Sequence, residues 1–344
     1  MNPLVWSLLI TALATSTLIT MSSNHWFLAW LGLELNTLSI LPIMMKHHHP
    51  RATEAATKYF LIQATAAASI LFASTINAWQ TGHWSLMHNN STTTMTLATV
   101  AIMMKLGIAP MHLWYPEALQ GIPMNTAMLI STWQKIAPLT FLYLLHSNLN
   151  PTMMLTIGLI SAAVGGWTGL NQTQTRKIMA FSSIAHMGWL LVALNFNPHL
   201  ATLTAILYLI ATTATFTILS STTTKTITDM GTTWTTSPTM LTTAMITLLS
   251  LGGLPPLTGF VPKWLILNEL TSMNLPTIGL MLLTTSLPSL FFYTRMAYVT
   301  TLTTPPTTTN TKLKWRMTTT LSSTSMIVLT WFMIPMTTAL YNTT

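Results

Sequence analysis

The sequence predicts an all-α polytopic membrane protein, and three observations lead to that fold class. Half of the 344 residues are hydrophobic. Only 5% are charged, whereas a globular domain carries about 25%. The apolar residues also come in long runs, close to the roughly 20 residues that a helix needs to cross a bilayer. Almost no sequence remains for a soluble domain.

Read in order, these runs predict eleven transmembrane helices. They are expected at residues 4–20, 26–45, 57–79, 95–115, 126–146, 153–170, 178–196, 200–220, 239–270, 276–299 and 321–340. The first run has no basic segment before it and no small-residue cleavage motif, so it is expected to be a retained span. The polar stretches 221–237 and 303–314 are expected to be loops.

The basic residues of the loops predict the topology. With the loops numbered in chain order, the even-numbered loops or their edges hold Lys46, Arg51, Arg176, Lys177, Lys225, Lys312, Lys314 and Arg316, and the odd-numbered loops hold no lysine or arginine. The positive-inside rule then places the N-terminus and the even loops on the cytoplasm-equivalent side. With eleven spans the C-terminus lies on the opposite side.

An internal repeat appears when the fourth and ninth spans are aligned with an offset of 146 residues. In this alignment, Gly107 pairs with Gly253, Pro110 with Pro256, Pro116 with Pro262 and Glu117 with Lys263. Five spans separate the two copies, so the second copy is expected to be inverted, as in transporters with discontinuous helices. Chance matching is the alternative, because Gly and Pro are common in membrane helices.

The repeat predicts the domain organisation. Residues 1–344 are expected to form a single transmembrane domain. It consists of a first five-helix repeat at 1–150, an inverted second repeat at 151–300, and a loop with a C-terminal helix at 301–344.

Four charged residues lie near the middle of predicted spans: Glu34, Lys105, Lys135 and Lys263. Each costs about 2.5 to 3.5 kcal/mol at a helix centre, so four cost on the order of 10 kcal/mol, which argues against functional neutrality. A structural ion pair between Glu34 and Lys105 is the main alternative. It leaves Lys135 and Lys263 without a carboxylate at the same depth.

An ammonium group without a partner in an apolar environment gives up its proton more easily than in water. Helix-breaking residues accompany the lysines: Pro110 follows Lys105, and Pro262 precedes Lys263. Pro256 is the repeat counterpart of Pro110. Interrupted backbone at membrane depth is tolerated where it is buried in protein or lines a wet cavity. The pattern therefore indicates a file of lysines that exchange protons.

Two histidines extend this list. His186 lies centrally in the seventh span, at the repeat position of the helix that holds Glu34, and His112 lies two residues beyond Pro110. Imidazole titrates near neutral pH, which suits proton transfer. A buried histidine satisfied by its neighbours is the alternative at both positions.

Other functional classes find little support. The chain has no cysteine, which excludes disulfides and thiolate-held iron–sulfur clusters. The net charge of +8 is dispersed over short loops, unlike the clustered patch of a nucleic-acid-binding protein. The triplet His47 to His49 does not converge on one metal ion, because consecutive side chains diverge. No metal or nucleic-acid site is expected.

The motifs WLGLELNTLSILP, KYFLIQATAAAS, KLGIAPMHLWYPEALQG, WQKIAP, SSIAHMGW and LGGLPPLTGFVPKW, with the opening MNPLVW, cover nearly the whole chain. With them the chain resembles the chain 2 family of mitochondrial NADH-ubiquinone oxidoreductase, respiratory complex I. The resemblance implies an antiporter-like, non-redox membrane subunit with two discontinuous helices. It also implies proton-transfer roles for Glu34, Lys105, Lys135, His186 and Lys263.

The same resemblance implies a setting. It places the chain in the mitochondrial inner membrane, with the N-terminus in the matrix and the C-terminus in the intermembrane space. The expected neighbours are other membrane-arm subunits, the small chain 4L and the antiporter-like chain 4 among them, with accessory subunits and lipids such as cardiolipin. NADH, FMN, iron–sulfur clusters and ubiquinone are expected on other subunits, and this chain is expected to bind no cofactor.

The leading hypothesis is a subunit that couples electron transfer from NADH to ubiquinone with proton pumping. A stand-alone cation/proton antiporter would use the same lysines and the same repeat, and an inert scaffold is a third possibility.

Overall fold

The computed structural model describes residues 2–46, 49–87, 91–233 and 238–302, with short pieces between 327 and 341. Across these residues the chain is helical, and strand pairing is limited to two isolated bridges. The predicted all-α class is confirmed. The chain divides into two compact units, Met1–Ile157 and Gly158–Thr344.

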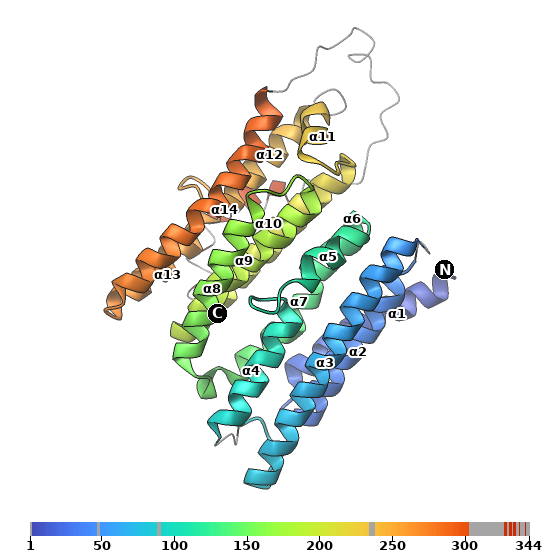
Figure 1. The fold of residues 1–344 in the computed structure, drawn as a ribbon, viewed down its shortest axis with the longest axis vertical. Helices are drawn as coiled ribbons and strands as arrows, with labels where there is room; N and C mark the ends of the chain where they lie inside the picture. The colour runs from blue at the N-terminus through green and yellow to red at the C-terminus, as the bar shows by residue number, and fades with distance from the viewer. Residues whose placement is uncertain are drawn as a thin grey trace. The chain divides into compact units, whose positions relative to one another are not determined.

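The described residues of the first unit form seven α-helices and one short 3-10 helix. They are α1 (Pro3–Ser22), α2 (Trp26–Met44), α3 (Pro50–Thr81), α4 (Thr92–Leu106), α5 (Trp114–Gly121), α6 (Met124–Ser131), α7 (Trp133–Leu145) and η1 (His146–Asn148). Helix α2 packs between α1 and α3 (Figure 1). The contact with α1 is close because Gly32 has no side chain: a Cβ there would lie 2.6 Å from Thr20 Cγ2.

The second unit contains α8 (Pro151–Gly169), whose first turns belong to the end of the first unit, then α9 (Thr175–Phe196), α10 (Pro198–Ser221), α11 (Ile227–Thr232), α12 (Pro238–Gly252), α13 (Phe260–Ser272) and α14 (Pro276–Leu302). Helix α9 lies at the centre of this unit, since 89% of its most apolar stretch is buried. It packs on α8 through small residues, which let two backbones approach closely. A Cβ at Gly188 would lie 2.6 Å from the Gly158 carbonyl oxygen.

Local sequence explains where several helices begin. A proline occupies the first position of α1, α3 and α10, where its missing N–H costs nothing. The residue before each proline accepts a hydrogen bond from the first turn: Asn2, His49 and Asn197. These starts are thus set by capping, independently of the tertiary packing.

Both helices that were predicted to be discontinuous are interrupted. The fourth span is split into α4 and α5, and the ninth into α12 and α13. Each break opens with a glycine in the left-handed region, at φ +68° for Gly107 and +82° for Gly253. Only glycine adopts this conformation without steric cost, and it ends a helix by turning the chain away from its axis.

Other expectations need correction. The fifth span was expected as one apolar run at 126–146, but it is divided: Thr132 separates α6 from α7, and its hydroxyl donates to the Met128 carbonyl at 2.7 Å. The stretch 221–237 was predicted to be loop throughout, yet it contains α11. Thr226 and Asp229 form a capping box there, a sequence signature that could have been recognised.

Seven of the described helices are long and apolar enough to cross a membrane. The remaining predicted spans are shorter because the interruptions divide them. Most of the expected C-terminal helix lies outside the described residues, as do Lys312, Lys314, Arg316, His47 and His48. The inversion of the second repeat and the proposed repeat boundaries stay predictions.

Candidate functional site

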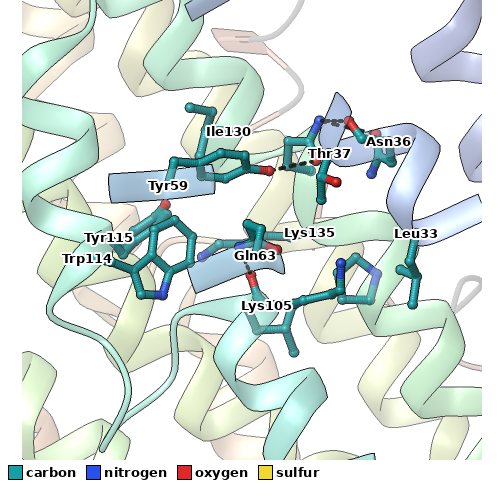
Figure 2. A pocket seen from close by; sticks show the side chains of 13 residues that line it. Leu33, Asn36, Thr37, Tyr59, Gln63, Lys105, Trp114, Tyr115, Ile130 and Lys135 are labelled. Carbon is teal, nitrogen blue, oxygen red and sulfur yellow. Dashed lines mark hydrogen bonds between the residues drawn. The ribbon is translucent and has the colours of Figure 1, made fainter. Parts of the chain in front are cut away.

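Each unit contains one cavity lined by predicted site residues. The cavity of the first unit is small, about 10 Å³, and lies among α2, α3, α4, α5, α6 and α7. Its lining is Leu33, Asn36, Thr37, Tyr59, Gln63, Lys105, Leu106, Trp114, Tyr115, Ile130, Gln134, Lys135 and Pro138 (Figure 2). Two of the predicted lysines thus share one enclosed, partly polar space.

Lys105 lies at the last turn of α4, one residue before the helix ends. A helix end leaves its last carbonyls without intrahelical partners. The N–H groups of Gly107 and Ile108 bond to the carbonyls of Met104 and Met103, at 3.2 and 3.1 Å. The carbonyl of Lys105 accepts from Gln63 Nε2 at 3.2 Å. These bonds give partners to three of the last four carbonyls of α4.

The side chain of Lys105 has a different environment. The residue is 5% exposed, and its Nζ has no hydrogen-bond partner. The negative end of the α4 dipole favours a cation in the last helical turn. Lys105 is thus a buried ammonium site that is supported by the helix end but is not tied to a neighbouring side chain.

Glu34, the predicted partner of Lys105, makes no contact ion pair with it. The Glu34 Oε2 atom is buried and has no hydrogen-bond partner, and the Lys105 Nζ has none either. The carboxylate still acts on Lys105 electrostatically. Glu34 lies in the middle of α2 and does not line the cavity. The two side chains therefore interact electrostatically without being in contact.

Lys135 follows the interruption at Thr132 and lies in the first turn of α7. It is 3% exposed, and its Nζ stands 4.8 Å from the centre of the Tyr115 ring. An aromatic face attracts a cation, by about 2 kcal/mol when both groups are desolvated. This contact holds the ammonium in the cavity.

Buried polar side chains connect three helices beside the lysines. Gln134 Nε2 donates to Asn36 Oδ1 at 3.1 Å, and the Tyr59 hydroxyl donates to Gln134 Oε1 at 3.4 Å. Asn36, Tyr59 and Gln134 come from α2, α3 and α7. Figure 2 shows Asn36, Tyr59 and Gln63 around the cavity. Because buried polar groups need partners, this network fixes the relative positions of the three helices.

The cavity of the second unit, about 40 Å³, is lined by two further predicted residues, His186 and Lys263. Its lining comes from α9, α10, α12, α13 and the break between the last two: His186, Trp189, Thr204, Leu207, Tyr208, Ala211, Ser250, Leu251, Thr258, Gly259, Pro262, Lys263 and Ile266. The Lys263 Nζ also stands 5.9 Å from the centre of the Trp189 ring.

Lys263 itself satisfies the broken end of α12. Its Nζ donates to the Gly252 carbonyl at 2.9 Å. This is a charge-assisted hydrogen bond at the negative end of a helix dipole, which favours the ammonium form. In the first unit the comparable bond comes from an uncharged amide. The two breaks therefore differ in whether the capping group can lose a proton.

His186 lies between two tyrosines of the same unit. The Tyr293 hydroxyl is 3.5 Å from His186 Nε2, and the centre of the Tyr208 ring is 5.7 Å from the centre of the imidazole. A hydroxyl can donate or accept, so Tyr293 can pair with either protonation state of the imidazole.

The secondary candidates are dispersed. Pro262 lines the second cavity. Pro256 is exposed in the α12–α13 break. His112 and Pro110 lie in the α4–α5 break and line neither cavity, and His112 Nδ1 is 3.2 Å from the Pro110 carbonyl oxygen.

The sequence-based prediction did not include the uncharged polar members of the two cavities, chiefly Asn36, Tyr59, Gln63, Gln134 and Tyr208. Attention to charge alone overlooked them. A usable signal was present, since amides are rare and costly inside apolar spans unless they are hydrogen-bonded. Gln134 even directly precedes Lys135.

Known proteins share sequence and fold with this chain. The model of the family "NADH:quinone oxidoreductase/Mrp antiporter, TM" matches residues 23–289, and that of "NADH dehydrogenase subunit 2 C-terminus" matches residues 290–341. The NADH-ubiquinone oxidoreductase chain 2 of Carassius auratus is 49% identical over 347 residues, covering 100% of both chains. That of Xenopus laevis is 49% identical over 316 residues, covering 92% of each.

A solved structure shares the fold. A chain of respiratory complex I from Thermus thermophilus with bound aureothin superposes with a TM-score of 0.84 at 24% sequence identity, covering 96% of this chain and 77% of that one. The matched length, the identity and the family models agree. The chain belongs to the NADH-ubiquinone oxidoreductase chain 2 family.

Proposed function

We propose that this chain is a membrane-arm subunit of proton-translocating NADH:ubiquinone reductase, respiratory complex I, and that it moves protons on buried side chains. Membership of the chain 2 family supports the first part. One observation carries the second. In each unit a lysine lies at an interrupted helix and lines a cavity: the buried Lys105 beside Lys135 in one, and the half-buried Lys263 beside His186 in the other.

The geometry suggests how each group acts. Glu34 changes the electrostatic field at Lys105 without contacting it, so a change in the charge or position of Glu34 alters the proton affinity of Lys105. Lys135 shares the cavity of Lys105 and receives that signal next. In the second unit, loss of the Lys263 proton weakens its bond to the Gly252 carbonyl. Proton release and loosening of the α12–α13 break are thereby coupled.

The setting forms part of the proposal. The chain resides in the mitochondrial inner membrane, with its N-terminus in the matrix and its C-terminus in the intermembrane space. Its neighbours are other complex I subunits, including the small chain 4L and the antiporter-like chain 4, and lipids such as cardiolipin fill gaps between them. NADH, FMN, the iron–sulfur clusters and ubiquinone bind to other subunits.

The proposed topology has a direct test because the chain contains no cysteine. Single variants Lys225→Cys and His83→Cys place a thiol in an even-numbered and an odd-numbered loop. A membrane-impermeant maleimide added to the matrix side should label residue 225 and spare residue 83. Labelling with the opposite pattern would refute the orientation.

The proton-transfer role is tested by Lys135→Met and Lys263→Met in the assembled complex. Methionine keeps the length of the side chain but cannot carry a proton. The quinone reductase rate should fall at least tenfold. The number of protons pumped per electron pair should also fall measurably. The control is Lys225→Met, because Lys225 is exposed in a loop. Normal rates and normal stoichiometry in both test variants would refute the proposed roles.

The antiporter alternative predicts a different result. A stand-alone exchanger, purified and reconstituted in vesicles, would exchange cations for protons without the other subunits. The subunit function predicts no exchange under those conditions.

A further inference from the structure

The backbone of Lys105 is anchored to a neighbouring helix by a side chain outside the predicted set. Gln63, on α3, donates from Nε2 to the Lys105 carbonyl at 3.2 Å. Figure 2 shows this contact as a dashed line beside the cavity. The bond joins α3 to the residue whose side chain is proposed to carry a proton.

Gln63 is well placed to control that residue. It is 3% exposed and lines the same cavity as Lys105 and Lys135. The Lys105 Nζ has no hydrogen-bond partner, so no neighbouring group holds the ammonium, and the position of the backbone sets the region that the side chain can reach. That backbone lies at a helix end, where carbonyls lack intrahelical partners and the chain frays most easily.

An uncharged amide suits this position. Its N–H cannot be lost at any physiological pH, so the bond persists whether or not Lys105 carries a proton. In the second unit the end of α12 is held by the Lys263 ammonium instead, and that bond changes when the proton leaves. The end of α4 can therefore stay closed during a proton step that loosens the end of α12.

We propose that Gln63 is a positioning residue for Lys105: its amide fixes the end of α4 and thereby places the ammonium in the cavity. This inference rests on the proposed function of Lys105. Gln63 itself does not transfer the proton, since a primary amide is neither acid nor base near neutral pH.

The test variant is Gln63→Met in the assembled complex, which keeps the length of the side chain and removes the donor. Coupled quinone reductase turnover should fall about tenfold, equivalent to about 1.4 kcal/mol in the barrier. The pH of half-maximal turnover should also move upward, because a frayed helix end admits water that solvates the ammonium.

A matched control separates positioning of Lys105 from general loosening of helix packing. Trp30 Nε1 donates to the Ala67 carbonyl of α3 at 3.0 Å, and Trp30 is absent from the lining of both cavities. Trp30→Phe therefore removes a bond of the same kind, from a side-chain N–H to a backbone carbonyl of a neighbouring helix in the same unit, and it should leave the pH profile unchanged. Equal losses in Gln63→Met and Trp30→Phe, with no pH shift in either, would overturn the inference.

A reference variant, Lys105→Met, distinguishes failure of the proposed Lys105 function from failure of the Gln63 positioning role. If Lys105→Met pumps and turns over normally, the proposed function of Lys105 fails, and the positioning role fails with it. If Lys105→Met is impaired while Gln63→Met behaves like the unmodified complex, only the positioning role is rejected.

A second substitution covers the case in which Gln63→Met does not assemble. Gln63→Glu keeps the shape of the side chain and carries an O–H donor when protonated. Its turnover should approach that of the unmodified complex as the pH falls and should decline as the carboxylate ionises. The turnover of the variant can be divided by that of the unmodified complex at each pH. If this ratio does not change with pH, position 63 does not need a hydrogen-bond donor.

Discussion

Gly259→Ala is expected to disrupt the second unit at the α12–α13 break. A Cβ at this position would lie 1.8 Å from the Ser250 carbonyl oxygen and 2.9 Å from its carbon. Real Cβ contacts stay above about 3.0 Å, so the two segments must separate by roughly 1.2 Å, the difference between 3.0 and 1.8 Å. Because the obstructing atoms are backbone, no side-chain rotation relieves the clash.

The size of the effect follows from the same geometry. Separation of α13 from α12 lengthens the 2.9 Å contact between Lys263 Nζ and the Gly252 carbonyl. A hydrogen bond from a charged group contributes about 1.5 to 3 kcal/mol, and overpacking costs about 1 to 3 kcal/mol. The free energy of unfolding of this unit should therefore fall by roughly 2.5 to 6 kcal/mol.

The assay is the amount of assembled complex and its thermal midpoint in native membranes, together with turnover. The matched control is Gly279→Ala, which makes the same chemical change in α14. There the new Cβ would meet its nearest atom at 3.5 Å, an ordinary van der Waals distance, so assembly and turnover should stay normal. A Gly259→Ala complex with unchanged midpoint, yield and turnover would refute the reasoning from close backbone approach.

Three further predictions address the rest of the chain. A hydrogen bond from the backbone N–H of Thr226 lowers the pKa of the Asp229 carboxyl. The stability that this carboxylate gives to α11 is therefore complete above about pH 4 and is lost as the pH falls through the lowered pKa. Asp229→Asn should abolish this acid dependence, measured by hydrogen exchange of the α11 amides. Gly188→Ala should lower the thermal midpoint, because its Cβ would clash with the Ser161 hydroxyl of α8, and an unchanged midpoint would contradict close α8–α9 packing. Glu117→Gln should leave both assembly and turnover nearly unchanged, since its ion pair with Lys58 is exposed and surface pairs contribute little; a large loss would show that this pair positions α5.

Several features of the fold could be predicted from the sequence because they depend on local chemistry. Apolar runs define most helices, since each backbone polar group in lipid must be satisfied within its own segment. The starts at Pro3, Pro50 and Pro198 follow from capping. The two expected breaks lie where Gly107 and Gly253 adopt positive φ. The interruption at Thr132 escaped prediction because threonine by itself does not require a break.

The candidate site divides in the same way. The depth of Glu34, Lys105, Lys135 and Lys263 in apolar segments could be read from the sequence, because charge in such a segment has a high energetic cost. Their partners could not. The hydrogen bond from Gln63 spans 42 residues of sequence and that from Gln134 to Asn36 spans 98.

Taken by itself, the sequence determined that this chain is a helical membrane protein, which charged residues lie within apolar segments, and two of the three places where a predicted span is interrupted in the described residues. Each of these follows from side-chain chemistry within a few turns of one helix. The tertiary structure alone decided that Lys105 and Lys135 share a cavity, that Glu34 acts on Lys105 without contact, and that Lys263 caps the end of α12. These relations depend on how separate helices pack, and residues distant in the chain meet only when the whole unit has folded.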